Sequence, residues 1–231
     1  MEKATTSGTL VLLLAITTFS AASADDLRPL SSTLGPQGIA GPLTALRVAF
    51  NRTGAAAFEL HGADVPPIIN EQSLFLKSKP LVEWSASLAA RATLMFVDLG
   101  PEKNPSTFFP YVHSLWGHCR ARPGAASVTI DDCATAYKPY QPPGNVALIP
   151  NRYTFILFRH VPTRVAPGAQ LIVMGKAVTG REKKPPRIAG LSFARLLREN
   201  VGLEAVAANF VFVKGSGTGA RRGGRRMRAR G

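Results

Sequence analysis

The chain has 231 residues, of which 45% are hydrophobic, and its formal net charge at pH 7 is +14. This length and apolar content suit one domain with a sizeable core and flanking tails. Beyond the N-terminus no apolar run is long enough to cross a membrane, which excludes a protein with several spanning helices.

The first 24 residues have the pattern of a secretory signal peptide. The apolar run from Leu10 to Phe19 is short for a bilayer span, and Ala22-Ser23-Ala24 forms a small-x-small cleavage signal. The basic start of the segment is weak, because Glu2 offsets Lys3, and an uncleaved membrane anchor is the alternative. The segment predicts a signal peptide over residues 1–24 and a secreted, extracellular protein.

Residues 25–42 are rich in Ser, Pro and Gly and are predicted to form an N-terminal arm before one domain over residues 43–213. Short apolar or alternating runs, separated by Pro and Gly clusters, predict a mainly β protein of the β-sandwich class. The near-continuous apolar run Ala92–Val97 suits a central strand covered on both faces. The other expected strands are Leu46–Phe50, Ala57–Leu60, Leu81–Trp84, Tyr111–Trp116, Tyr153–Phe158 and Gln170–Met174.

One helix is expected, over residues 192–200. Ser192 is a suitable N-cap residue, and Gly202 lies where the helix is expected to have ended. Three apolar residues at i, i+3 and i+4 predict one buried face, and they are Phe193, Leu196 and Leu197. No internal repeat is found, and no second domain is expected.

The two cysteines, Cys119 and Cys133, flank a turn-rich segment. An oxidising compartment favours a disulfide between them, and two buried free thiols are the alternative. Asn51 opens an Asn-Arg-Thr sequon on an expected loop, which predicts N-glycosylation in a secreted protein.

Residues 214–231 form a basic tail without any acidic residue. The tail is predicted to be disordered, because it has too little apolar surface to fold. It can be a solvated tail without a partner, or it can attach to an anionic membrane or glycan. Nucleic acid is disfavoured, because a secreted protein rarely meets it. The basic residues are Lys214, Arg221, Arg222, Arg225, Arg226, Arg228 and Arg230.

Several pieces of the chain occur in the order of a known set of motifs. These pieces are Phe58–Gly62 with Val65-Pro66, Leu81–Trp84, Leu94–Asp98, Tyr111–Leu115, Pro142-Pro143, Asn151–Tyr153, and Phe193-Ala194 with Gly202-Leu203 and Val206–Phe210. In this order they resemble the phosphatidylethanolamine-binding protein family, of which the chain is identified as a divergent, secreted member. The resemblance implies an antiparallel β-sandwich with one or two short helices, and a pocket for a small anion.

Asp98 and His113 are the central residues of the implied pocket. Asp98 ends an apolar strand, and burying its carboxylate unpaired would be costly. It either lines the pocket, as the resemblance implies, or caps its loop by accepting from backbone amides between Leu99 and Glu102. His113, two residues from Tyr111 on one strand face, is expected to be partly protonated near neutrality and to donate to an anion. The alternative is a structural histidine packed under a loop.

The resemblance adds four further ligand-binding residues. Phe108 matches a pocket aromatic, and Pro142 and Pro143 match a rigid turn whose neighbouring amides face the ligand. Asn151 replaces the histidine of the family's H-R-Y motif, which removes the charge from one hydrogen-bond donor. Gly100 replaces the second acid of its D-P-D-A-P loop, so phosphate affinity is expected to be reduced.

No metal site is expected. In a regular strand His113 and His118 point to opposite faces, so one ion could not bind both without a bulge. By the same alternation Ser114 is expected on the opposite face from His113. The sequence contains no G-x-S-x-G elbow and no phosphate loop, so an enzyme is disfavoured.

The expected function is a secreted, non-catalytic protein that captures a phosphorylated headgroup or a similar small anion. If protonated His113 holds the anion, affinity is expected to fall as the pH rises through its pKa in the complex. The alternative is a protein-interaction regulator, such as a protease inhibitor or signalling modulator, that uses the same scaffold with a degenerate pocket. No cofactor is expected, and the protein is expected to be a monomer.

Overall fold

The structure, a computed structural model, describes residues 34–35, 38–39, 42–52, 55–60, 68–70, 74–101, 110–145, 148–161, 170–180 and 187–215. The expected signal peptide, Phe108 and the tail beyond Gly215 lie outside the described residues, as do most of the arm and the side chain of Asn51. The backbone of Asn51 lies within a strand, so the expected loop at the sequon is wrong.

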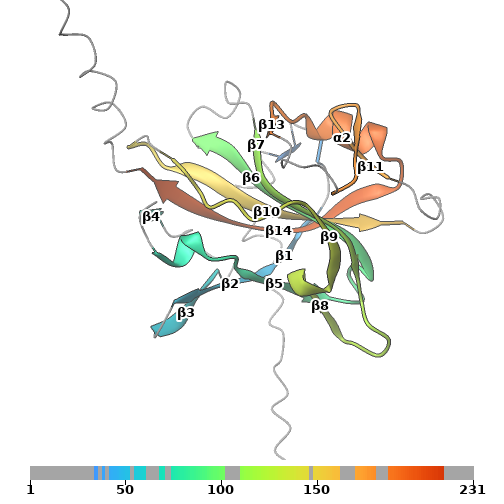
Figure 1. Cartoon of the computed structure of the whole chain (residues 1–231), viewed down its shortest axis with the longest axis horizontal. Coiled ribbons are helices and arrows are strands. Elements are labelled where there is room, and N and C mark those ends of the chain that lie inside the picture. The colour runs from blue at the N-terminus through green and yellow to red at the C-terminus, as the bar shows by residue number, and fades with distance from the viewer. Residues whose placement is uncertain are drawn as a thin grey trace, which may run out of the picture.

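A large mixed sheet forms the centre of the protein (Figure 1). Its strand order is β1-β14-β10-β6-β7-β13, with β4 added to β14 and β9 added to β7. The pairs among β14, β10, β6 and β7 are antiparallel, whereas β1 and β4 run parallel to β14. The strands are β1 (Thr44–Ala45), β4 (Ile68–Asn70), β6 (Arg91–Pro101), β7 (Tyr111–Arg120), β9 (Cys133–Lys138), β10 (Asn151–His160), β13 (Ile188–Ala189) and β14 (Leu203–Lys214).

A second sheet and a helical layer lie on either side of the central sheet (Figure 1). The second sheet has the order β3-β2-β5-β8, and its pairs are antiparallel. Its strands are β2 (Arg47–Arg52), β3 (Ala55–Leu60), β5 (Leu81–Ser85) and β8 (Ser127–Thr129). The remaining elements are the ribbon β11 (Leu171–Val173) and β12 (Lys176–Val178), the 3-10 helices η3 (Leu74–Lys77) and η5 (Ile130–Asp132), and helix α2 (Phe193–Glu199).

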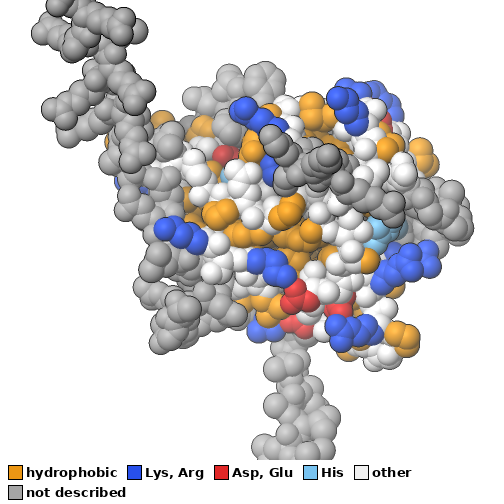
Figure 2. Space-filling view, viewed as in Figure 1, with side chains coloured by type: hydrophobic (Ala, Val, Ile, Leu, Met, Phe, Trp, Pro, Cys, Tyr) orange, Lys and Arg blue, Asp and Glu red, His pale blue; other side chains and the backbone are white. Residues whose placement is uncertain are grey.

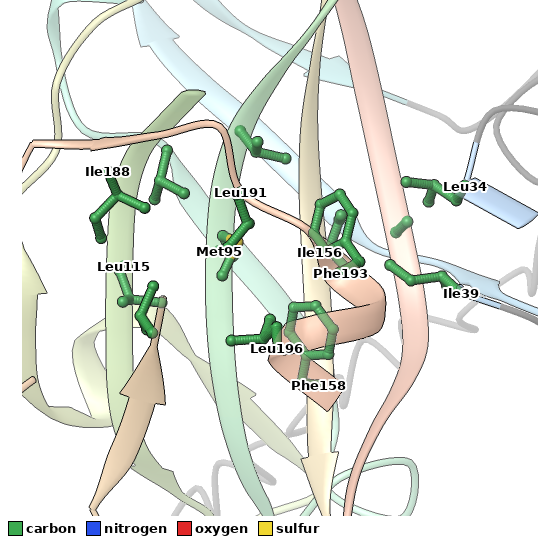
Figure 3. Close-up of a cluster of buried hydrophobic side chains, with 14 of the residues drawn as sticks. Leu34, Ile39, Met95, Leu115, Ile156, Phe158, Ile188, Leu191, Phe193 and Leu196 are labelled. Atoms are coloured by element: carbon green, nitrogen blue, oxygen red, sulfur yellow. The ribbon is translucent and has the colours of Figure 1, made fainter. Parts of the chain in front are cut away.

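Strand β6 separates two hydrophobic cores. Met95 and Val97 belong to the core under α2, and Leu94 and Phe96 belong to the core between the two sheets. Figure 3 shows the first of these cores, where the side chains of α2 meet those of the central sheet. The prediction of a central strand covered on both faces is therefore confirmed.

The predicted helix is also confirmed. The Oγ atom of Ser192 accepts a hydrogen bond from the backbone amide of Arg195 at 3.3 Å, so Ser192 is the N-cap residue. Phe193 and Leu196 are buried under the sheet, and Leu197 packs beside them. Gly202 follows the helix with a φ of 88°, which favours glycine.

The predicted strands of the central sheet are present, and most extend beyond their expected limits. The sequence pattern does not predict the edge strand β9, and it predicts β14 only through the resemblance of its middle residues. The expected disulfide joins Cys119 of β7 to Cys133 of β9, which are directly paired across the two strands. Among the described residues, no helix is long and apolar enough to cross a membrane.

Candidate functional site

Three neighbouring strands bring the expected site residues together. Tyr111 on β7, Asp98 on β6 and Tyr153 on β10 are Cα partners in one row across the sheet. The ring of His113 lies between the two tyrosines, with centroid distances of 5.0 Å to Tyr111 and 5.1 Å to Tyr153. Asp98, Tyr111 and His113 therefore form one cluster, as the sequence predicts, and Tyr153 joins them.

A β-bulge places His113 in this cluster. Phe96 pairs with Ser114 and Val97 pairs with Val112, so His113 is an extra residue in β7. Ser114 Oγ accepts a hydrogen bond from the amide of Gln141, the same residue whose carbonyl oxygen contacts His113. The expectation that Ser114 points away from His113 is therefore wrong, because it assumed an unbroken alternation.

The hydrogen bonds of His113 assign its tautomer. Nδ1 lies 3.3 Å from the carbonyl oxygen of Gln141 and 3.1 Å from that of Pro142. A carbonyl oxygen only accepts, so Nδ1 carries the proton, and Nε2 of the neutral ring is an acceptor.

The free protein holds His113 neutral. Burial lowers the pKa of His113 to about 4, and the positive charge of Lys138 also lowers it. At pH 7 the imidazole is therefore uncharged, and the expected partial protonation near neutrality is wrong for the free protein.

Asp98 is buried but well supplied with donors. Its Oδ1 accepts from the amide of Gly100 at 2.7 Å, its Oδ2 accepts from Nδ2 of Asn151 at 3.0 Å, and Tyr153 donates to it as well. Burial raises the pKa of Asp98, and these three donors partly offset that effect. Gly100 has a φ of 78°, a backbone conformation that favours glycine at this position.

Asn151 and the proline turn serve the site differently from the expected pattern. One donor of Asn151 is bonded to Asp98, so the amide orients the carboxylate. The carbonyl oxygen of Pro142 orients His113, and Pro143 is buried. The amide of Gln141, which precedes the turn, is bonded to Ser114 and is not directed at a ligand.

Lys138 joins this cluster, although no pattern in the sequence marks it as a site residue. Its Nζ atom donates to Oη of Tyr111 at 3.2 Å and lies 4.5 Å from the centre of the Tyr111 ring. Lys138 is the last residue of the edge strand β9. It comes close to the site because β9 pairs with β7, and this pairing is not visible in the sequence. A predicted strand running from Cys133 to Tyr137 would have been the sequence signal that brings Lys138 to the site.

The two other described histidines make structural contacts. His118 has a φ of 54° within a second bulge of β7, and its Nε2 is 2.9 Å from the hydroxyl of Tyr137. His160 is hydrogen-bonded to Thr93. Within the described residues, no three His, Cys, Asp or Glu side chains are grouped as metal ligands.

No model of a known protein family matches this chain, and no curated protein matches its sequence. Solved structures do match it. The structure of a carboxypeptidase Y inhibitor with its cognate proteinase has a TM-score of 0.56 and 14% identity, over 83% of this chain and 94% of the other. The phosphatidylethanolamine-binding protein of Plasmodium vivax has a TM-score of 0.56 and 14% identity, over 84% of this chain and 98% of that protein.

The chain has the fold of the phosphatidylethanolamine-binding proteins. The phosphatidylethanolamine-binding protein of Plasmodium falciparum is similar as well, with a TM-score of 0.51 and 13% identity over 85% of this chain and 99% of that protein. The resemblance predicted from the sequence is therefore confirmed for the fold. At these sequence identities the similarity establishes the fold alone. The ligand of this phosphatidylethanolamine-binding-protein-like chain must be inferred from its own residues.

Proposed function

We propose that this protein is a non-catalytic binding protein that captures a phosphorylated headgroup or a similar small anion. The observation that carries the proposal is the cluster of Asp98, Tyr111, His113 and Tyr153, formed by three adjacent strands. Two structures with this fold are of proteins named for phosphatidylethanolamine binding.

The chemistry of the cluster favours a ligand that also donates hydrogen bonds. Asp98 is an acceptor, and Nε2 of neutral His113 is an acceptor too. A positively charged ammonium group is a suitable partner for a carboxylate, and ethanolamine phosphate carries both an ammonium group and a phosphate. Phosphoethanolamine is therefore the first ligand to test.

Secretion is part of the proposal. The Cys119–Cys133 disulfide is of the kind that persists in oxidising compartments. On the face shown in Figure 2, Lys and Arg side chains are spread widely, with acidic side chains among them. Surfaces that bind nucleic acid usually gather basic residues in one stripe, so this arrangement does not favour nucleic-acid binding on this face.

A protease inhibitor is the second candidate. One structure with this fold is of an inhibitor bound to its proteinase. Leu148 and Ile149, close in sequence to Asn151, are each 61% exposed and offer an apolar contact for a protein partner. Loss of partner binding on replacing both residues with serine, without any effect of His113→Ala, would favour this candidate.

Calorimetric titration of the purified protein with phosphoethanolamine and with inorganic phosphate tests the proposal. We expect saturable binding that is lost in Asp98→Ala and in His113→Ala, because both side chains line the cluster. Lys176→Met is the matched control, since Lys176 is exposed on the separate ribbon strand β12. A folded parent protein that releases no heat with either ligand would contradict the proposal.

A further inference from the structure

A lysine is almost fully buried beside the cluster. Lys138 is only 4% exposed. Burying an ammonium group is costly unless an opposite charge or several acceptors compensate it. Among the described residues, no acidic side chain forms an ion pair with Lys138, and the hydroxyl of Tyr111 is its hydrogen-bond acceptor. Two of the three N–H groups of the ammonium therefore remain for another partner.

The ammonium group of Lys138 contacts the candidate site through Tyr111. Tyr111 Oη accepts from Lys138 and donates to Oε1 of Gln141 at 3.2 Å, so the proton of its hydroxyl is already used. The same tyrosine ring contacts His113 edge-on. The positive charge of Lys138 also lowers the pKa of His113, as its contact with Tyr111 next to that ring leads one to expect.

Among the described residues, the other donors of the cluster carry no positive charge for an anion. The imidazole of His113 is neutral, and Nδ1 is committed to the turn at Gln141 and Pro142. Asn151 supplies a neutral amide that is bonded to Asp98. Within the described part of the cluster, Lys138 is therefore the cationic side chain that an anion beside Asp98 would meet.

We infer that Lys138 is the cationic anchor of this site, and that its ammonium binds the phosphate of the ligand next to the Tyr111 hydroxyl. This inference rests on the proposed function and adds to it a residue that carries the charge. The shared chemistry is the phosphate group, whether it belongs to a headgroup or is free in solution.

Variants of the full chain test the inference by calorimetry at low and at high salt. Lys138→Met keeps the length of the side chain and removes its charge, and Lys138→Arg keeps the charge. We expect Lys138→Met to weaken both inorganic phosphate and phosphoethanolamine about ten- to a hundredfold, the value of a charged hydrogen bond. We expect Lys138→Arg to stay within a few fold of the parent. Lys176→Met is again the control, and circular dichroism checks folding.

The outcomes separate this inference from the proposed function. If the parent binds and Lys138→Met binds equally well, the role of Lys138 as the anchor is overturned, whereas the proposed binding site is not. If the folded parent binds neither ligand, both are overturned. Should Lys138→Met fail to fold, the salt dependence of the parent decides, because an affinity that does not fall with rising salt overturns a charged anchor. A loss confined to phosphoethanolamine, with phosphate unaffected, also overturns it.

Discussion

The ring of His113 is enclosed by Phe96, Tyr111 and Tyr153, and its Nδ1 donates to two backbone carbonyl oxygens. Burial therefore favours the neutral ring and lowers its pKa to about 4. In an unfolded chain the same residue takes up a proton near pH 6.5. The contribution of His113 to stability is thus fully present above pH 6.5, and it is lost as the pH falls toward 4.

Replacing His113 with Asn should flatten the acid side of the stability profile. Asn keeps a donor near the position of Nδ1 and removes the titrating group. The parent should lose on the order of 3 kcal/mol from this residue between pH 7 and pH 4, and His113→Asn should not show that part of the loss. Urea unfolding at several pH values measures it. Equal losses in the parent and the variant would contradict the neutral histidine.

Asp98 has the opposite dependence on pH. Its pKa is raised by burial, so the folded protein holds this proton more strongly than the unfolded chain does. Its contribution to stability is present at low pH and decreases as the pH rises through the raised pKa. Comparing the protein with and without His113→Asn in an Asp98→Asn background therefore isolates the contribution of His113 from that of the carboxylate.

Strands β7 and β9 show how the pairing of elements shapes the site. The disulfide between Cys119 and Cys133 links them, and β9 then carries Tyr137 and Lys138 along the edge of β7. Two bulges in β7 change which side chains face the sheet neighbours. The edge strand positions the proposed anchor, so its close packing against β7 matters for function as well as for stability.

Gly117 tests this packing. A Cβ atom at Gly117 would lie 2.2 Å from Cε2 of Tyr137, so the ring would have to move and lose its contact with His118. We expect Gly117→Ala to lower the free energy of unfolding by about 1–3 kcal/mol.

The control is Gly144→Ala, because a Cβ atom at Gly144 would meet nothing within 4 Å. Thermal or urea unfolding compares the two variants with the parent. Equal stability of Gly117→Ala and Gly144→Ala would show that the β7–β9 contact is looser than the structure indicates.

At the scale of the whole molecule, the positive charge is distributed between a folded domain and a basic tail. Among the described residues, the last members of the two cores are Phe212 and Val213. Residues 216–231 hold six arginines. We propose that the tail attaches the protein to an anionic membrane or glycan.

A chain that ends at Gly215 should keep its melting temperature and bind anionic vesicles more weakly. Each basic residue near an anionic surface contributes about 1 kcal/mol, so the loss should be large at low salt and small at high salt. Vesicle co-sedimentation of the full and shortened chains measures the difference. Equal binding of both chains would contradict a role of the tail at the membrane.

Local patterns of the sequence predict much of this fold. The apolar run of β6 predicts its burial on both faces, and the cap at Ser192 predicts the start of α2, because both depend on residues close together in the chain. That Asp98, Tyr111 and His113 lie near one another is also foreseen through the order of the motifs. The bulge at His113 is not, since an extra residue becomes visible only when the partner strand is in register.

What the sequence determined by itself is therefore the β architecture, the capped helix, the cysteine pair and the types of side chain at the site. The tertiary structure alone decided the charge state of His113, the partner of Asn151 and the place of Lys138. These depend on burial and on contacts between residues far apart in the chain. Desolvation and long-range electrostatic interactions arise only when the strands have packed together, so no local pattern contains them.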